Sequence, residues 1–429
     1  MTQNEFADAT ERERAIGTFD RNLLVTAGAG TGKTTLLVDR LVELLLRNPE
    51  PLRITEIVAL TFTNKAANEI KLRLRERLEA YLAVRLDRAP LNESEGRAQR
   101  EITSLIERYQ HSKDDLDRRA SDALRAMERS EIGTIHSFAA TLLRLYPMEG
   151  GIDPQFKEDD GKEFERTFDE QWELWLDEEL ALAGSHAHDW RILLRKLRLD
   201  QIKTLAKSLC SETVDLQRAR LNSKKDSTLP LLQPWLENLE SKATALLEVH
   251  REDRHNEKLI RAARGVIRKF RKCGRVEEDD SGEAQSSVAE KSINKDLRGW
   301  SETDILEAQD LLRTTRNLGQ VDVELTQLVW KLLVPFVEKF RECFVREGFV
   351  SFDGLLIRAR NLLRDCPAVR EELKRQFRAI LIDEFQDTDP IQYEILLYLA
   401  EKANHCAKEW RAIRLSPGKI FVVGDPKQS

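Results

Sequence analysis

The chain has 429 residues, of which 34% are charged and 41% are hydrophobic, and its formal net charge is −6 at neutral pH. This length exceeds one ordinary hydrophobic core, so two or three domains are expected. The sequence shows neither a signal peptide nor an apolar run long enough to cross a bilayer, so we expect a cytoplasmic protein without membrane association. The five cysteines are scattered without a CxxC pair, which argues against a disulfide framework or a zinc site. The acidic balance argues against a wholesale basic coat, yet it leaves room for a locally basic groove for nucleic acid.

The most informative stretch runs from Asn22 to Thr35. An apolar run predicts a short buried strand at Leu23–Val25, and an apolar-periodic helix is predicted from Thr34 to Leu46. Between them lies a glycine-rich loop with the spacing of a phosphate-binding loop, although alanine stands at its first position. In such loops backbone N–H groups surround an anion, the lysine approaches the β/γ-phosphates and a threonine hydroxyl can ligate Mg²⁺. An ordinary surface turn is the alternative. We predict that nucleotide is bound by Ala27, Gly28, Ala29, Gly30, Thr31, Gly32, Lys33, Thr34 and Thr35.

Predicted strands recur along the chain and alternate with predicted helices. Apolar, β-branched runs predict strands at residues 54–62, 130–134, 377–383 and 420–423. Residues 86–128 are mostly polar with helical apolar spacing, which predicts exposed helices inserted between two core strands. Right-handed parallel crossovers of this kind give an α/β fold with helices on both faces of a parallel sheet. We therefore expect the nucleotide at the carboxyl edge of that sheet.

An acidic pair follows one of the predicted strands. Asp383 would hold Mg²⁺ at the strand tip, and Glu384 would orient and deprotonate the attacking water. The alternative for such a pair is an N-cap or a solvated turn. Beyond the last predicted strand, the amide of Gln428 could donate to the γ-phosphate and accept from water. We expect Lys33 and the acidic pair to converge on one triphosphate at one edge of the sheet.

Five motifs, in this order, resemble those of the UvrD/Rep-type superfamily-one DNA helicases. The phosphate loop, the His-Ser-Phe segment and the Gly-Asp-Pro-Lys-Gln-Ser ending are more similar to the exonuclease-subunit branch, RecB and AddA, than to UvrD itself. The motifs are Ala27–Thr34, Leu60–Ala67, Thr134–Phe138, Asp383–Asp387 and Val423–Ser429.

The resemblance implies a RecA-like P-loop NTPase domain with a large all-helical inserted domain. Residues 1–155 would form the first part of motor domain 1A, with a helical insertion at about 86–128. Residues 156–342 would form the helical accessory domain 1B, and residues 343–429 the second part of domain 1A. A second motor domain, with the arginines that reach the γ-phosphate, is expected beyond Ser429, so this chain alone should hydrolyse ATP weakly.

The resemblance also implies a path for single-stranded DNA. Phe62 would stack on a base, while hydroxyls and a helix N-terminus would contact phosphates of the strand. The alternatives are that Phe62 and Phe138 are core aromatics and that His136 is an internally satisfied histidine. The residues implied to contact DNA are Thr61, Phe62, Thr63, Asn64, Thr134, His136 and Ser137.

The resemblance also draws attention to two arginines at positions that the family uses to recognise adenine. Arg40 matches the family arginine that packs on adenine, with a solvated helix residue as the alternative. Arg12 stands where the family has its adenine-reading glutamine, so the chain departs from the family pattern there.

The predicted helical domain corresponds by position to the accessory subdomain that meets duplex DNA. Between about residue 160 and residue 342 it holds six of the seven tryptophans and almost no strand signal. A basic run in it could contact phosphates, although most basic helix faces are only solvated. The run consists of Arg261, Arg264, Arg268, Lys269, Arg271, Lys272 and Arg275.

These features predict the N-terminal motor part of an ATP-dependent DNA helicase that acts in repair or recombination, with ATP and Mg²⁺ as cofactors. The implied partners are single-stranded DNA, a duplex junction and a nuclease or helicase-like subunit. One rival is a different P-loop ATPase, such as a transporter or an AAA-type motor, against which the Thr-Phe-Thr-Asn-Lys-Ala-Ala segment counts. The other rival is a non-catalytic, helicase-like scaffold within a DNA-processing complex. The intact Lys33, Asp383 and Glu384 argue against this second rival.

Overall fold

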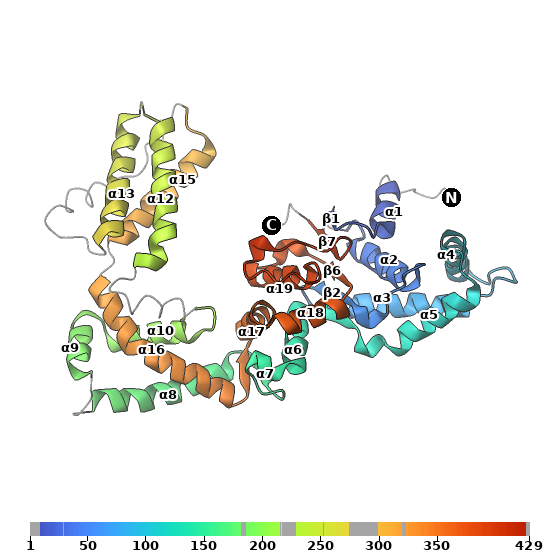
Figure 1. Ribbon diagram of the computed structural model, residues 1–429, viewed down its shortest axis with the longest axis horizontal. Coiled ribbons are helices and arrows are strands. Elements are labelled where there is room, and N and C mark those ends of the chain that lie inside the picture. The colour runs from blue at the N-terminus through green and yellow to red at the C-terminus, as the bar shows by residue number, and fades with distance from the viewer. Residues whose placement is uncertain are drawn as a thin grey trace. The chain divides into compact units, whose positions relative to one another are not determined.

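The computed structural model describes residues 9–28, 30–181, 186–214, 216, 229–251, 253–273, 299–319 and 323–425. The chain divides into two compact units, one formed by residues 1–161 with 345–429 and the other by residues 162–344. The first unit contains the sheet, and the second is built from helices (Figure 1).

Five short parallel strands form the sheet of the first unit, in the order β1-β7-β6-β2-β3. Because every pairing is parallel, the carboxyl ends of all five strands lie at one edge. The register aligns these ends directly: Thr26 pairs with Gly424, and Thr61 pairs with Thr134. The strands are β1 (Leu23–Thr26), β2 (Ile57–Thr61), β3 (Glu131–Thr134), β6 (Ala379–Ile382) and β7 (Ile420–Gly424).

Helices cover both faces of this sheet, so the fold is α/β with a parallel sheet (Figure 1). One face carries α2 (Lys33–Leu46), α3 (Asn64–Ala83), α4 (Glu93–Tyr109) and α5 (Lys113–Arg125). The other face carries α6 (Ile135–Leu145), α17 (Phe352–Asp365), α18 (Pro367–Gln376) and α19 (Pro390–Ala400). Two further helices, α1 (Ala9–Gly17) and α7 (Pro147–Gly150), complete the unit.

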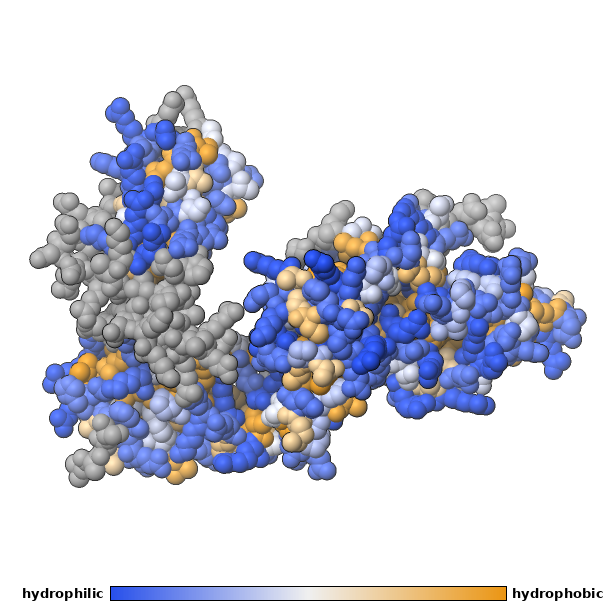
Figure 2. Space-filling model, in the orientation of Figure 1, coloured by the Kyte–Doolittle hydropathy of each residue, from blue (hydrophilic) through white to orange (hydrophobic). Residues whose placement is uncertain are grey.

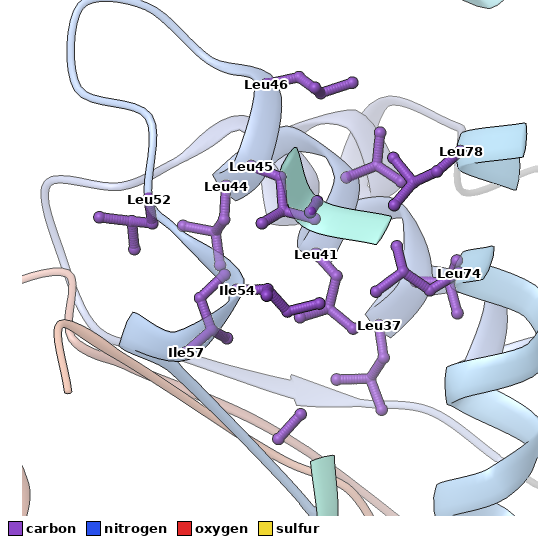
Figure 3. Close-up of a cluster of buried hydrophobic side chains, with 14 of the residues drawn as sticks. Leu37, Leu41, Leu44, Leu45, Leu46, Leu52, Ile54, Ile57, Leu74 and Leu78 are labelled. Carbon is purple, nitrogen blue, oxygen red and sulfur yellow. The ribbon is translucent and has the colours of Figure 1, made fainter. Parts of the chain in front are cut away.

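The side chains of the strands alternate between two hydrophobic cores. Ile57 and Ala59 of β2 enter the core under α2, whereas Val58 and Leu60 enter the core under α17. This alternation is the period-two pattern of a strand that is buried on both faces. Figure 3 shows part of the first core, in which leucines of α2 meet leucines of α3 beside β2. Each buried leucine contributes roughly 1.5–3 kcal/mol relative to an exposed one.

The strands depart from the sequence expectation in two places. The strand predicted for residues 54–62 begins only at Ile57, because Ile54–Glu56 forms a 3-10 turn, η1. A second, unpredicted sheet pairs β4 (Lys157–Asp159) with β5 (Phe349–Ser351) in parallel. These strands flank residues 162–344, so their pairing brings the two ends of the second unit's chain segment together.

Every regular element that the structure describes in the second unit is a helix. An aromatic cluster packs α8 against α16, where Phe168 and Phe336 meet edge to face with ring centroids 5.7 Å apart. A separate hydrophobic core joins α12, α13 and α15. The helices are α8 (Lys162–Leu180), α9 (Ala187–Lys196), α10 (Leu199–Cys210), α12 (Leu229–Val249), α13 (Arg254–Cys273), α15 (Glu302–Gly319) and α16 (Val323–Arg346).

Hydrophilic residues cover most of the visible surface, with smaller apolar patches between them (Figure 2). Among the described residues, no helix combines the length and apolar character needed to cross a bilayer.

Candidate active site

The glycine-rich loop joins the end of β1 to the start of α2 at the carboxyl edge of the sheet. Gly30 and Gly32 have φ values of 75° and 81°, in the left-handed region that glycine adopts without strain. The hydroxyl of Thr31 donates to the Gly28 carbonyl oxygen at 2.8 Å, which closes the loop on itself. Helix α2 has no side-chain N-cap bond in the described structure, so its first N–H groups remain suited to an anion. Ala29 lies outside the described residues.

Lys33, the first residue of α2, meets the acidic pair that follows β6. Its ammonium nitrogen lies 2.6 Å from Oε2 of Glu384, a residue 351 positions away in the sequence. The side chain of Lys33 is only 8% exposed, whereas that of Glu384 is 34% exposed. The backbone N–H of Asp383 donates to the Leu60 carbonyl oxygen at 2.8 Å, which ties the acidic pair to the end of β2. The structure therefore brings Lys33, Asp383 and Glu384 together at one edge of the sheet.

The pKa values of Asp383 and Glu384 shift in opposite directions. Burial raises the pKa of Asp383 above its ordinary value, and the adjacent charge of Glu384 adds to this shift. Burial also acts to raise the pKa of Glu384, but hydrogen bonds from Lys33 and Gln386 outweigh it, so this pKa lies below its ordinary value. Glu384 has a φ of 52°, in a region that non-glycine residues rarely adopt. Such backbone conformations are concentrated at functional sites.

Gln386 is a site residue that the sequence analysis did not single out. Its amide nitrogen donates to Oε2 of Glu384 at 2.6 Å, and its amide oxygen accepts from the backbone N–H of Asp425 at 2.9 Å. A Cβ atom at Gly424 would lie 3.0 Å from that amide oxygen, so the glycine keeps this approach open. Gln386 thus links Glu384 to the end of β7. Its position two residues after Glu384 was visible in the sequence, but its contact with β7 was not.

Arg12 contacts the phosphate-binding loop. One of its guanidinium nitrogens donates to the carbonyl oxygen of Thr31. The guanidinium also lies beside Gly32, where an added Cβ would be 3.5 Å from it. Arg12 therefore supports the loop itself, and its place at the position of an adenine-reading glutamine stays a prediction.

Arg40 is buried within the protein. The residue is 1% exposed, so the alternative of a solvated helix arginine is wrong. Its guanidinium donates to the carbonyl oxygen of Ala15 at 2.6 Å and lies 4.5 Å from the ring centroid of Phe19 and 4.6 Å from that of Phe421. Burial, together with the charge of Arg47, lowers its pKa to about 10. Packing on adenine stays a prediction.

Two of the residues predicted to contact DNA have hydroxyls that cap helices. The hydroxyl of Thr63 accepts from the Ala66 N–H at 3.1 Å and caps α3. The hydroxyl of Thr134 accepts from the Ser137 N–H at 3.2 Å and caps α6. These caps place the N-termini of α3 and α6 at the ends of the paired strands β2 and β3. Thr61 itself is buried, while Asn64 begins α3 and is exposed.

The predicted aromatic residues divide between surface and core. Phe62 is 63% exposed, which excludes the core alternative, whereas Phe138 is 2% exposed and packs on Phe377. His136 packs edge to face on Phe352, with ring centroids 5.5 Å apart. No local pattern in the sequence indicates this contact of Phe352.

A cavity of about 120 Å³ joins the two groups of predicted residues. Phe62 and His136 line it from the predicted DNA side, and Asp383 and Glu384 line it from the predicted catalytic side. The groups are therefore adjacent in the structure.

The predicted γ-phosphate contact, Gln428, lies outside the described residues. The predicted basic run is described only in part, because Arg275 also lies outside them. Within that run, Arg268 and Arg271 lie 2.5 Å and 2.7 Å from the carboxylate of Glu240, which neutralises part of the basic surface.

The fold and the site define an α/β protein whose parallel sheet carries a lysine and an acidic pair at its carboxyl edge. A model of the UvrD/REP helicase N-terminal domain matches residues 8–429, so the chain belongs to this family and the predicted resemblance is confirmed.

Similar proteins include three that are named as ATP-dependent helicase/nuclease subunits. The protein from Listeria welshimeri is 24% identical over an alignment 476 residues long, which spans 97% of this chain and 34% of the relative. The protein from Oceanobacillus iheyensis is 24% identical over 481 residues, covering 98% and 35%. The protein from Syntrophomonas wolfei is 26% identical over 465 residues, covering 98% and 33%. The chain thus spans about a third of the length of these relatives.

Proposed function

We propose that this chain is the N-terminal motor part of an ATP-dependent DNA helicase that acts on single-stranded DNA in repair or recombination. The parallel-sheet unit is the P-loop, RecA-like motor domain 1A, and the helical unit of residues 162–344 is the accessory domain 1B, which the sequence predicted at residues 156–342. The observation that carries this proposal is the contact between Lys33 and Glu384 at the carboxyl edge of the sheet. The names of the relatives support a place in a helicase–nuclease assembly with a partner protein.

The residues at this edge fit a magnesium nucleotide. The positive-φ glycines and the uncapped start of α2 suit phosphate oxygens, and Lys33 supplies a positive charge among them. Thr34 and Asp383 are the oxygen donors that would hold Mg²⁺, a cation that prefers such ligands. When bound, Mg²⁺ would neutralise charge on the phosphates.

Glu384 is the group that would accept a proton from the attacking water. Its lowered pKa keeps it ionised at neutral pH, as a base must be. Before nucleotide arrives, Glu384 holds Lys33; phosphate oxygens that recruit this ammonium would release the carboxylate toward water. Gln386 keeps Glu384 in place and connects it to β7, the strand that leads toward Gln428.

The cavity beside the acidic pair offers a route by which DNA could affect hydrolysis. A base stacked on Phe62 would lie against a cavity whose other wall contains Asp383 and Glu384. A displacement of the carboxyl ends of β2 and β3 would then be transmitted to the acidic pair through the backbone hydrogen bond from Asp383 to Leu60.

The test is ATP hydrolysis by the complete helicase that we propose contains this chain, measured against the concentration of a thymidine oligonucleotide. We expect stimulation by the oligonucleotide and loss of turnover in Lys33→Ala. A rate that does not respond to single-stranded DNA, or normal turnover in Lys33→Ala, would overturn the proposal.

A further inference from the structure

A second cavity, of about 490 Å³, lies away from the proposed nucleotide and DNA sites. Its walls come from the loop at residues 51–55, from α5 and from η2 (Met127–Arg129). These segments immediately precede β2 and β3, whose carboxyl ends carry the predicted DNA-contacting residues. The cavity therefore lies toward the amino edge of the parallel sheet, on the opposite side from the candidate active site.

The floor of this cavity is part of the hydrophobic core. Leu45, Leu52 and Ile54 contribute to it, and Figure 3 shows these three side chains in the core cluster beside α2. Pro51 and Ala126 add further apolar surface. A volume of this size falls within the range of about 300–1,000 Å³ that is typical of ligand pockets.

Arginines dominate the charged lining. Four of them, Arg53, Arg119, Arg125 and Arg129, line the cavity with one carboxylate, that of Asp122. Arg53, Arg125 and Arg129 are exposed and form no salt bridge with any described residue. The adjacent Arg118 on α5, by contrast, is paired: its guanidinium is 2.8 Å from Asp115.

The lining therefore concentrates positive charge in a chain whose net charge is −6. Guanidinium groups bind carboxylates through paired hydrogen bonds, and arginine is enriched where protein interfaces bind tightly. DNA phosphates need a basic surface but no apolar cavity, and the proposed DNA path lies at the other edge of the sheet. An apolar floor beneath a basic rim instead matches a peptide that carries both carboxylates and an apolar side chain.

We infer that this cavity is a docking site for an acidic segment of a partner protein, which inserts one large apolar side chain among carboxylates that pair with the arginine rim. The inference goes beyond the proposed helicase function and does not depend on it. The positive rim requires a partner segment with negative charge, and the apolar floor requires that this segment carry an apolar side chain.

The probe is a fluorescein-labelled peptide of six glutamates around one central phenylalanine, titrated with the 429-residue chain by fluorescence anisotropy. We expect saturable binding at a Kd below about 1 mM. The double variant Arg125→Glu/Arg129→Glu should weaken it by about tenfold or more, because attractive contacts become repulsive. Arg118→Glu, which reverses one charge outside the cavity, is the control and should bind nearly as the parent does.

Two further measurements complete the test. The same peptide with alanine in place of phenylalanine should bind more weakly, and Ala126→Phe, which fills the cavity, should weaken the phenylalanine peptide selectively. Thermal unfolding checks each variant, and Arg125→Gln/Arg129→Gln replaces the double variant if that one is unfolded. Four results would overturn the inference: no saturation at about 1 mM, equal binding by the charge-altered variants, equal binding of the two peptides, or tighter and equally charge-dependent binding of a labelled DNA duplex.

Discussion

Replacing Glu384 with glutamine removes the charge that holds Lys33 while it keeps nearly the same side-chain shape. The Lys33 and Glu384 side chains are 8% and 34% exposed, so the pair lies between a buried and an exposed ion pair. Buried pairs cost about 3–5 kcal/mol when one partner is removed and exposed pairs contribute about 0–1 kcal/mol, which places this contact at roughly 1–2 kcal/mol. A nucleotide that recruits the ammonium of Lys33 must displace this contact.

Glu384→Gln should therefore bind Mg-ATP about tenfold more tightly than the parent chain, since about 1.4 kcal/mol corresponds to a factor of ten. The same change removes the proposed base, so the rate of ATP hydrolysis in the presence of single-stranded DNA should fall by about 10²–10⁴. Calorimetric titration of this chain measures the affinity, and release of inorganic phosphate by the complete helicase that we propose contains it measures the rate.

Glu394→Gln is the matched control for this experiment. Glu394 pairs with Arg360 at 2.8 Å, and the two side chains are 17% and 20% exposed. The control should leave both the affinity and the rate close to those of the parent. Weaker nucleotide binding by Glu384→Gln, or a rate within about threefold of the parent, would refute the proposed roles of the pair.

Four further outcomes are expected. Phe62→Ala should weaken binding of a thymidine oligonucleotide by about five- to 150-fold, because base stacking contributes about 1–3 kcal/mol, while Leu72→Ala, at another exposed apolar residue, should not change it. Asp383→Asn should raise the thermal unfolding midpoint most at high pH, because burial penalises the ionised carboxylate, and the gain should shrink as the pH falls through the raised pKa; a gain that grows at low pH would contradict this sign. Gln386→Ala should lower kcat by about tenfold or more with little change in KM, because hydrogen bonds to charged groups contribute about 1.5–3 kcal/mol; a change in KM alone would contradict its positioning role. Arg40→Ala should reduce the free energy of unfolding in urea by about 2–4 kcal/mol, because it leaves a cavity and unpaired carbonyl groups; a change below about 0.5 kcal/mol would show that the burial has little energetic effect.

Local patterns predicted the elements that hold the candidate site. The apolar run before the glycine loop and the periodic helix after it correspond to β1 and α2, which place Lys33. The strand β6, which ends one residue before Asp383, was equally clear, because a continuous apolar run bounded by charges is typical of a strand buried on both faces. The contact of Lys33 with Glu384 then followed from the expectation of a shared sheet edge.

Features that depend on tertiary contact were not predictable. The strands β4 and β5 have three residues each, too few to show a period, and exist only because they pair with each other. The contact of Gln386 with Asp425 joins two segments that no local pattern relates. The burial of Arg40 depends on rings contributed by Phe19 and Phe421, so helix periodicity alone could not distinguish it from a solvated side chain.

The most direct test of the central claim is a calorimetric titration of Mg-ATP into the parent chain and into Lys33→Ala. The claim is that the lysine and the acidic pair at the carboxyl edge of the sheet form one nucleotide site. We predict saturable binding with one nucleotide per chain for the parent and no measurable binding for Lys33→Ala, with both proteins unfolding at similar temperatures. Equal affinity in the two proteins, or no binding by the folded parent, would contradict the claim.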